Sequence, residues 1–600
     1  MHIVAKETIT ELRKQMKAHN IDAYMIVTDD FHGSEYVGDH FKCRAYMSGF
    51  TGSAGTLVVT QDMAGLWTDG RYFLQAGKQL AGSGIDLFKM GEPGVPTVHA
   101  FLVDKLKEGQ TLGFDGRTVN AKEAFALKRD LEEKGAGVVY EQDLVDLVWK
   151  DRPALSAEPV TLLDEKYTGE SREERIRRVR EVMEEQGADL FVLSSLDDIA
   201  WLLNIRGNDV AYNPVVLSYL VLGGTEIRLY INEKVLDDTV REALEAAGVS
   251  FYPYDQMYED MKRINKKHTV LLDASKANFA IVSNIPAEVP VLDRPCPTVL
   301  MKAVKTPVEV ENERKAHIKD GVAVCRFLHW IKTNVGKIPM TEISVAEKLE
   351  EFRQMGENYR GQSFGPIAAY AEHGAIVHYS ATPETDKEIK ADSFLLLDTG
   401  GQYLEGTTDI TRTVALGNIT DEMKKHFTAV LKGNLNLVSA KFRKGCLGIN
   451  FDYLAREALW EMGLDYNHGT GHGVGYYLNV HEAPNGIPLE TEVPERNESA
   501  AFEAGMITSD EPGLYLEGKY GIRLENLIVC EKYMENEYGE FLQFKPLTFV
   551  PFDLDAVDPS LMTEKERARL NAYHAEVFEK ISPYLDEEET RWLAHETRAI

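Results

Sequence analysis

The most informative stretch of this 600-residue chain is HGTGHGVGYYLNVHEAP, at 468 to 484. Glycines at 469, 471, 473 and 475 let the backbone approach a neighbouring group closely. His472 lies between them, with His468 four residues before it and His481 nine residues after it. Imidazoles are both metal ligands and proton carriers, so this stretch predicts a site with one of these two roles.

Four acidic residues with carboxylates that could bind a metal flank this stretch in the sequence. Asp398 ends the apolar strand FLLLD, where a buried carboxylate is costly unless something positive lies beside it. Asp409 follows in TTDITRT, at a spacing that a strand, a turn and a returning strand would close. Glu511 in TSDEPGLY and Glu525 in GIRLENLIV follow on further strands.

Together with His472, these four carboxylates form a set of oxygen and nitrogen ligands without a thiol. Such a set suits hard or borderline divalent cations such as Mn²⁺, and bridging carboxylates allow two cations to lie side by side. Each residue taken alone has an ordinary alternative, as a turn cap, a core histidine or a solvated charge. Their occurrence together on apolar strands favours a two-metal hydrolase.

Length and composition predict a folded, multidomain protein. Six hundred residues are too many for one hydrophobic core, and 44% hydrophobic with 27% charged residues are ordinary values for globular proteins. The formal net charge of -30, from 96 acidic and 66 basic residues, would repel phosphate backbones and anionic membrane surfaces. We therefore expect no nucleic-acid partner.

Two features of the sequence indicate a reducing, cytoplasmic environment. The five cysteines (43, 296, 325, 446 and 530) are scattered without a CxxC pair, so we expect reduced thiols. Residues 1 to 20 alternate charged and apolar positions at helical spacing and lack the apolar core of a signal peptide. No stretch has the roughly 18 uninterrupted apolar residues that a membrane span needs, so we expect no membrane partner.

Two segments of the N-terminal half resemble each other. NIDAYMIVTDD at 20 to 30 follows an amphipathic helix, as GADLFVLSSLDD at 187 to 198 does. In both, a short apolar strand ends in an acidic turn, and further strands follow at 55 to 60 and 215 to 222. We therefore expect two related α/β domains, although any two helix–strand units share part of this pattern.

Composition also marks the domain boundaries. Residues 151 to 160 look like a linker, and four prolines between 286 and 297 exclude a continuous helix or central strand. Thr306, Pro307 and Glu309 match a helix N-terminus, with Thr as N-cap, Pro at the first helical position and Glu closing a capping box. The expected domains are 1–155, 156–305 and 306–552, with a helical extension at 553–600.

The third domain alternates helices with short strands. A long helix should run from Thr306 through CRFLHWIK, and two more should lie near 420 to 442 and 450 to 463. This alternation predicts an α+β domain in which antiparallel strands form the floor. The expected strands are SFLLLD at 393 to 398, TTDITRTVAL at 407 to 416, MITSDEP at 506 to 512 and GIRLENLIVC at 521 to 530.

The motifs now permit a comparison with a known family. The histidine stretch, with DTGGQYLEGTTDITRT before it and SDEPGLY and GIRLEN after it, resembles the metallopeptidase family with the pita-bread fold. LWTDGRYFLQA at 66 to 76 and KAVKTPVEVENERKAH at 302 to 317 resemble its three-domain cytosolic type, the aminopeptidase P group. The likeness covers nearly the whole chain. It implies two creatinase-like α/β domains, a pita-bread catalytic domain and a homodimer.

The resemblance also implies a role for each predicted ligand. Asp398 would chelate one ion, Asp409 and Glu525 would bridge both ions, and His472 with Glu511 would complete the second. Two divalent ions, most of all Mn²⁺, lower the pKa of a shared water toward neutrality, and Glu511 would accept and pass on its proton. All five family ligands are present, unlike in creatinase, which has the fold without the metals.

Three further histidines should line the pocket. The family pattern implies that His378, in GAIVHYSA, and His481 hydrogen-bond the developing oxyanion or help the leaving amine. His468 would shape the substrate pocket. Support of the glycine-rich loop is the alternative for His378 and His468.

Three other residues complete the predicted site. Arg523 lies two residues before Glu525 on one expected strand, so both side chains should share a face, and Arg523 would orient a ligand carboxylate. A plain surface salt bridge is its alternative. Phe364, in QSFGPIAAY, would form an apolar wall for a proline ring, and Arg71, in DGRYF, would lie near the substrate unless it only packs domains together.

These residues predict a manganese-dependent aminopeptidase that removes the first residue of short peptides with proline at the second position. The preference for proline rests on the resemblance. The nearest alternative is a prolidase, which takes Xaa-Pro dipeptides only. A more distant alternative is a protein of this fold that binds peptides without cutting them.

Overall fold

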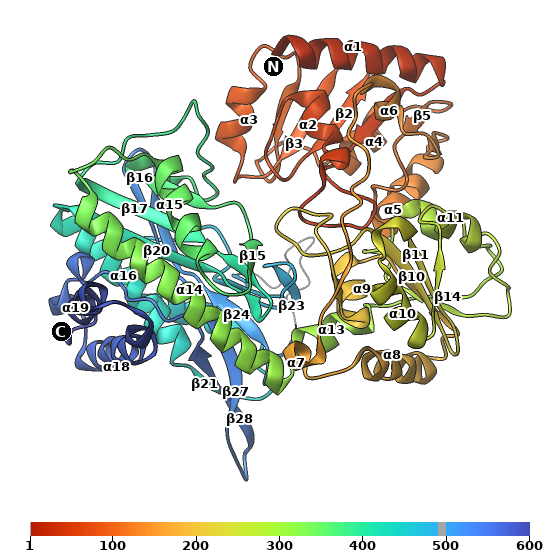
Figure 1. The fold of residues 1–600 in the computed structure, drawn as a ribbon. Coiled ribbons are helices and arrows are strands. Elements are labelled where there is room, and N and C mark those ends of the chain that lie inside the picture. The colour runs from red at the N-terminus through yellow and green to blue at the C-terminus, as the bar shows by residue number, and fades with distance from the viewer. Residues whose placement is uncertain (1, 490–499) are drawn as a thin grey trace. The chain divides into compact units, whose positions relative to one another are not determined.

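The computed structural model describes residues 2–489 and 500–600, and the chain divides into two compact units (Figure 1). Unit 1 comprises Met1–Leu162 and Arg172–Thr298, and unit 2 comprises Leu163–Ser171 and Val299–Ile600. The sheets of both predicted α/β repeats fall within unit 1, whereas 163–171 and 299–305 of the second predicted domain belong to unit 2. The five predicted metal ligands all fall within unit 2.

Unit 1 contains two six-stranded sheets with the same topology. In each sheet the central strands pair antiparallel and the outer strands pair parallel. The first sheet has the order β4 (Asp86–Lys89), β3 (Ala64–Thr68), β2 (Thr56–Thr60), β1 (Ala23–Ile26), β5 (Thr111–Gly113), β6 (Gly137–Val139). The second has the order β12 (Val249–Tyr252), β11 (Ile227–Ile231), β10 (Ser218–Gly223), β8 (Leu190–Leu193), β13 (Val270–Leu272), β14 (Val291–Asp293). The predicted duplication is confirmed.

The helices of the two repeats bury equivalent apolar stripes. Helix α1 (His2–Ala18) buries Ile9, Leu12 and Met16, and helix α8 (Arg172–Gln186) buries residues at the same spacing, Ile176, Val179 and Met183. The remaining helices of unit 1 are α2 (Cys43–Ser48), α3 (Phe73–Gln79), α4 (Val98–Lys105), α5 (Ala121–Glu132), α6 (Leu144–Val148), α9 (Leu196–Leu203), α10 (Asp238–Ala246), α11 (Gln256–Met261) and α12 (Phe279–Ser283).

The predicted linker and the proline-rich stretch have the expected character. Residues 151–160 form neither helix nor strand. Strand β14 lies between Pro290 and Pro295 at the edge of its sheet, where missing N–H donors are tolerated. Helix α13 (Pro297–Ala303) then begins at a proline.

Helix α14 (Pro307–Asn334) begins with the predicted capping box. Thr306 Oγ1 accepts a hydrogen bond from the Glu309 backbone N–H at 3.1 Å, and Glu309 Oε2 accepts one from the Thr306 N–H at 2.9 Å. The two other predicted helices are α16 (Asp421–Val438) and α17 (Ile449–Trp460). All three predictions are confirmed.

The strands of unit 2 pair antiparallel, which confirms the predicted α+β architecture. One sheet has the order β16 (Ile367–Tyr370), β17 (Asp392–Thr399), β20 (Ile410–Gly417). A larger sheet has the order β21 (Lys441–Arg443), β28 (Gly539–Pro546), β27 (Asn526–Asn536), β24 (Ile507–Asp510), β22 (Gly471–Gly473), β23 (Glu482–Ile487).

Two strands that we predicted as continuous are interrupted. The segment at 407 to 416 divides into β19 (Gly406–Thr407) and β20, and the break contains Asp409. The segment at 521 to 530 divides into β26 (Tyr520–Arg523) and β27, and the break contains Glu525. Both carboxylates therefore come from short breaks between strands.

The C-terminal segment is helical and packs into the core of unit 2, as predicted. Helices α18 (Glu564–Ile581) and α19 (Glu587–Glu596) lie beside α14 in Figure 1. Leu570 and Leu593 belong to the same buried cluster as Phe327 of α14 and Leu395 of β17. This segment thus supports the layer that carries Asp398.

The structure also bears on the expected thiols and on membrane spans. Cysteines 43, 296, 325, 446 and 530 are all free thiols. Among residues 2–489 and 500–600, no helix combines the length and the apolar character that crossing a membrane requires.

Candidate metal centre and active site

Three of the predicted ligands converge in unit 2. Asp409, His472 and Glu525 each offer one ligand atom, and these atoms lie within 4.8 Å of one another. Asp409 comes from the break before β20, His472 from β22 and Glu525 from the break before β27. Residues from three distant parts of the sequence therefore form one cluster that can hold a metal ion.

The carboxylates of this cluster are buried with unused hydrogen-bonding capacity. Asp409 is 4% exposed and Glu525 is 1% exposed. Among the predicted ligands, three buried carboxylate oxygens have no hydrogen-bond partner within the described residues: Asp398 Oδ1, Asp409 Oδ1 and Glu525 Oε1. A buried acceptor without a donor is unfavourable, and a cation offsets that cost. The residues present therefore fit a hard divalent cation.

His472 points one ring nitrogen at two of the carboxylates. Its Nε2 lies 3.5 Å from Asp409 Oδ2 and 3.6 Å from Glu511 Oε1. Its Nδ1 lies 2.9 Å from the Gly473 carbonyl oxygen, which can only accept, so Nδ1 carries the proton. The lone pair of Nε2 is then directed at the carboxylates, as a metal ligand requires.

Asp398 is held in place by Arg523. Arg523 Nη2 donates a hydrogen bond to Asp398 Oδ2 at 2.5 Å. On β17, Asp398 is paired with Thr411 of β20, and Thr411 Oγ1 donates to Glu525 Oε2 at 2.7 Å. Strand pairing and the Thr411 hydrogen bond thus connect Asp398 with Glu525.

Burial and mutual repulsion raise the pKa values of these carboxyl groups. Burial, followed by the negative charge of Asp398, raises the pKa of Asp409 to about 8. Burial raises the pKa of Glu511 to about 7, and His472 partly offsets this shift. Burial and neighbouring carboxylates also hold the pKa of Glu525 well above its ordinary value. Without cations the cluster therefore keeps protons near neutral pH.

The three other histidines differ in their surroundings. His481 packs edge-to-face against His472, with ring centroids 4.4 Å apart. His468 Nε2 hydrogen-bonds Tyr515 Oη at 2.8 Å, and Tyr515 Oη accepts from Arg523 Nη1 at 2.8 Å. His378 is exposed in the turn after Ala371–Ala375, next to Val377, whose carbonyl accepts from Arg523 at 3.5 Å.

Our prediction that Arg523 and Glu525 share a face of one strand is wrong in its geometry. Arg523 ends β26, whereas Glu525 lies in the break before β27. The two side chains still meet at Thr411, because Arg523 Nε donates to Thr411 Oγ1 at 3.4 Å. Arg523 is 2% exposed, so the alternative of a surface salt bridge is excluded.

Phe364 and Arg71 occupy different units. Phe364 is half-buried between β15 (Tyr359–Gln362) and β16, and a Cβ on Gly400 would lie 2.9 Å from its ring. Gly400 is two residues from Asp398, so Phe364 lies near the end of β17 that carries this ligand. Arg71 belongs to unit 1, where its Nε and Nη2 donate to the two carboxylate oxygens of Asp69, each at 2.8 Å.

The sequence did not lead us to three residues that support the ligands. Ser509 Oγ accepts from the His472 N–H at 2.9 Å and donates to Glu511 Oε1 at 3.2 Å. Thr411 and Tyr515 hydrogen-bond Glu525 and Arg523 as described. Ser509 lies two residues before Glu511, and Thr411 lies two residues after Asp409, so strand periodicity could have indicated both. Nothing in the sequence pairs Tyr515 with Arg523.

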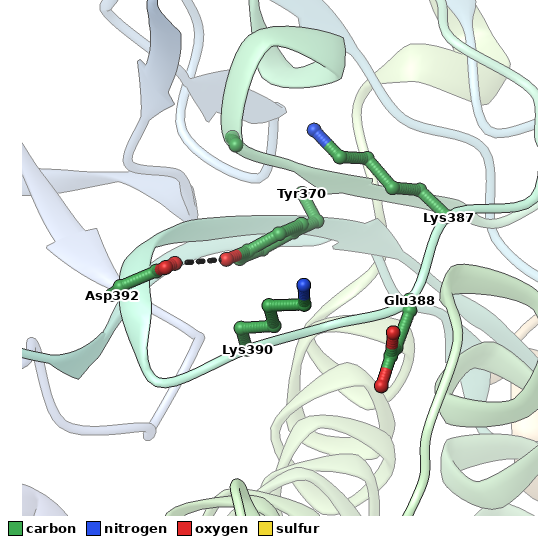
Figure 2. A pocket seen from close by; sticks show the side chains of 6 residues that line it. Tyr370, Lys387, Glu388, Lys390 and Asp392 are labelled. Carbon is green, nitrogen blue, oxygen red and sulfur yellow. Dashed lines mark hydrogen bonds between the residues drawn. The ribbon is translucent and has the colours of Figure 1, made fainter.

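A surface hollow elsewhere in unit 2 is separate from this centre. Figure 2 shows it, with Tyr370 Oη hydrogen-bonded to Asp392 and with Lys387, Glu388 and Lys390 around them. Tyr370 is at the opposite end of β16 from Ile367, which pairs with Asp398. The hollow therefore lies at the other end of these strands and takes no part in the cluster.

A carboxylate–histidine centre in an antiparallel α+β domain defines the class of metal-dependent hydrolases. Comparisons with known families agree. Residues 311–532 match metallopeptidase family M24, and 540–600 match the C-terminal region of peptidase M24. Residues 9–146 and 151–309 each match the creatinase/prolidase N-terminal domain.

Individual relatives extend this match to the whole chain. The "Probable Xaa-Pro aminopeptidase P" of Coprinopsis cinerea is 40% identical, over 99% of this chain and 98% of its own. A crystal structure of an X-prolyl aminopeptidase from Caenorhabditis elegans, described as cytosolic with a di-nuclear active site, is 36% identical with a TM-score of 0.93, over 99% of this chain and 100% of its own. A prolidase from Pyrococcus horikoshii shares the fold at 22% identity and a TM-score of 0.50, over 64% of this chain and 99% of its own. This chain belongs to metallopeptidase family M24, with the pita-bread catalytic domain.

Proposed function

We propose that this protein is a manganese-dependent aminopeptidase that releases the first residue of short peptides with proline at the second position. The observation that carries the proposal is the convergence of Asp409, His472 and Glu525 on one buried point. The relatives named as Xaa-Pro aminopeptidases, which match nearly the whole chain, support this substrate class.

Two divalent cations would be held by the five predicted ligands. Asp398 would bind one ion, Asp409 and Glu525 would bridge the two, and His472 with Glu511 would bind the other. When bound, the cations supply a water of lowered pKa as the nucleophile. Oxygen-rich coordination with one imidazole favours Mn²⁺ over softer ions.

Side chains of the protein would transfer protons and donate hydrogen bonds to developing charge. Burial raises the pKa of Glu511 to about 7, which suits a group that accepts and returns a proton near neutral pH. His481, in contact with His472, and His378 would donate hydrogen bonds to the carbonyl oxygen under attack or to the leaving amine. His468 would border the substrate pocket through its contact with Tyr515.

Recognition of proline would depend on apolar contact, because an imide nitrogen offers no N–H. Phe364, half-buried near the end of β17, would form one wall for the ring. Arg71 would bind the peptide. Phe364→Ala should then reduce discrimination between Xaa-Pro and Xaa-Ala peptides, whereas Arg71→Ala should raise KM with less effect on kcat.

A prolidase would use the same centre but accept dipeptides only. An Xaa-Pro-Yaa tripeptide and the matching Xaa-Pro dipeptide, incubated with the Mn²⁺-loaded protein, separate the two functions. Release of Xaa from the tripeptide supports the aminopeptidase, and cleavage confined to the dipeptide would support the prolidase. Tight peptide binding without any cleavage would support a non-enzymatic role.

We also infer a cytoplasmic homodimer. Tyr453 and Trp460 of α17 are 52% and 43% exposed, and their rings lie 5.9 Å apart on one helical face. Exposed aromatic residues of this kind are enriched in protein–protein contacts. Light scattering should give twice the 67.4 kDa chain mass, and Trp460→Glu should shift it toward the monomer.

A further inference from the structure

Two buried lysines meet one buried glutamate beside the histidine stretch. Lys305 Nζ donates to Glu482 Oε1 at 2.5 Å, and Lys302 Nζ of α13 donates to Glu482 Oε2 at 2.8 Å. The exposed fractions of Lys305, Lys302 and Glu482 are 4%, 7% and 6%. Lysines are rarely buried this deeply, so their arrangement calls for a specific reason.

Lys305 connects the two arms that carry His472 and His481. Its ammonium also donates to the Val474 carbonyl oxygen at 2.6 Å. Val474 follows His472 by two residues, and Glu482 follows His481 directly. One ammonium thus bridges the backbone of the first arm and the carboxylate of the second.

Strand pairing alone does not fix the separation of these arms. In the pairing of β22 with β23, His472 lies opposite Gly486 and Gly473 opposite Glu482, so the register shifts between His472 and Gly473, and His481 lies just before β23. The two imidazoles nevertheless make close edge-to-face contact, with centroids 4.4 Å apart. A contact from outside the sheet can therefore hold the two imidazole rings at this separation.

Lys305 itself has a fixed backbone position. Its N–H donates to the Gly505 carbonyl oxygen at 3.2 Å, and the next residue, Thr306, caps α14. Gly505 has φ +102°, and a Cβ there would lie 2.6 Å from the Lys305 carbonyl oxygen. Only glycine permits this approach, so the ammonium projects from a rigid base.

Because two ammonium groups share Glu482, Lys305 can be replaced without leaving this carboxylate unpaired, while the buried Glu313 loses a positive neighbour that lowers its pKa. Two ammonium groups share one carboxylate, so loss of either lysine still leaves Glu482 paired with a cation. Removal of one partner from an isolated buried pair would leave an uncompensated charge, which is strongly destabilising. Here Lys305→Met removes the bridge to Val474 without creating such a charge on Glu482.

We propose that Lys305 is a positioning residue that sets the spacing of His472 and His481, acting through Val474 and Glu482 and touching neither metal nor substrate. This inference rests on the proposed function only for its effect on turnover. Its structural consequence, the distance between the two rings, does not depend on any activity.

The first test compares three single variants of the full-length, Mn²⁺-loaded protein. Lys305→Met should lower kcat by roughly tenfold to a hundredfold, as expected when catalytic groups shift by about 1 Å. Lys302→Met leaves the contact between Lys305 and Val474 intact and should lower kcat by a smaller factor. Lys332→Met removes a partly buried lysine, paired with Asp553 at 2.6 Å, and should lower the melting temperature while kcat stays within about twofold.

A double-mutant cycle with His481→Ala decides whether Lys305 acts through this histidine. In the His481→Ala background, Lys305→Met should reduce kcat by a smaller factor than it does in the parent protein. Equal losses in both backgrounds, or an unchanged kcat in Lys305→Met, would overturn the proposal. If the Lys305→Met variant does not fold, Glu482→Gln can take its place in the cycle. It weakens the same bridge, and its effect on kcat should likewise be smaller in the His481→Ala background.

Crystals of the Lys305→Met variant provide the readout that is independent of activity. The centroid separation of His472 and His481 should exceed the 4.4 Å of the parent chain. An unchanged separation would overturn the positioning role. A parent chain that cleaves no peptide would instead refute the proposed function and leave this structural test standing.

Discussion

Arg523 Nη2 donates a 2.5 Å hydrogen bond to Asp398 Oδ2, joining residues 125 positions apart in the sequence. The guanidinium also donates to Tyr515 Oη, which contacts His468. One buried cation therefore fixes the orientation of a ligand carboxylate and connects it to the pocket. The other oxygen of Asp398, Oδ1, has no partner within the described residues and is free to bind a metal.

Replacement of this arginine tests its positioning role. Arg523→Lys keeps the charge but cannot reach Asp398, Tyr515 and Thr411 together, because an ammonium lacks the planar fork. We expect metal affinity and kcat/KM to fall by roughly tenfold to a hundredfold, the usual cost of losing a residue that orients a ligand. Calorimetric titration with Mn²⁺ and steady-state kinetics measure the two effects. Wild-type values for both would show that Arg523 is dispensable.

Removal of a predicted ligand should have a larger effect. Asp398→Ala or Glu525→Ala should abolish hydrolysis and lower the bound metal measured by elemental analysis. Asp392→Ala is a matched control, because Asp392 is an exposed carboxylate at the other end of the same strand, β17. The control should keep both metal and activity. Full activity in either ligand variant would refute the assignment.

The raised pKa values predict how pH affects metal binding. Asp409 and Glu511, with pKa values of about 8 and about 7 in the folded protein, titrate near 4 in an unfolded chain. Their contribution to the stability of the metal-free protein is therefore present below about pH 4 and lost as the pH rises through 7 to 8. Cations bind the deprotonated carboxylates, so they compete with these protons.

Thermal melting with chelator and with Mn²⁺ at pH 6, 7 and 8 measures this competition. The chelated protein should melt at lower temperature as the pH rises, and the increase caused by Mn²⁺ should become larger over the same range. A Mn²⁺ effect of equal size at pH 6 and pH 8 would show that the carboxylates are already deprotonated in the metal-free protein.

Metal exchange tests the choice of ion. Activity on an Xaa-Pro-Yaa tripeptide should disappear after chelation and return with added divalent cations. Mn²⁺ should restore the most activity, because four carboxylates and one imidazole provide a hard ligand set. The same protein sample titrated with Zn²⁺ is the comparison, and a higher kcat/KM with Zn²⁺ would contradict the assignment.

Local sequence signals predicted much of this fold because their physical causes are local. The capping box of Thr306 and Glu309 depends only on residues within one helical turn, and α14 begins where it indicates. The repeat was visible because, in both copies, an amphipathic helix precedes a short apolar strand that ends in an acidic turn. The alternation of helices and antiparallel strands in unit 2 followed from periodicity alone.

The site was predicted less completely because its contacts are long-range. Asp409 and Glu525 were placed on strands, but each lies in a break, where a turn can direct a carboxylate toward a shared point. The hydrogen bond from Thr411 to Glu525 spans 114 residues, and the contact of Lys305 with Glu482 spans 177. Periodicity within one segment carries no information about such pairs.

The most direct test of the central claim is anomalous X-ray diffraction from crystals grown with saturating Mn²⁺. Two manganese peaks should appear among Asp398, Asp409, His472, Glu511 and Glu525, with Asp409 and Glu525 touching both. Crystals in which these side chains surround no manganese, or in which the ions bind elsewhere, would contradict the claim.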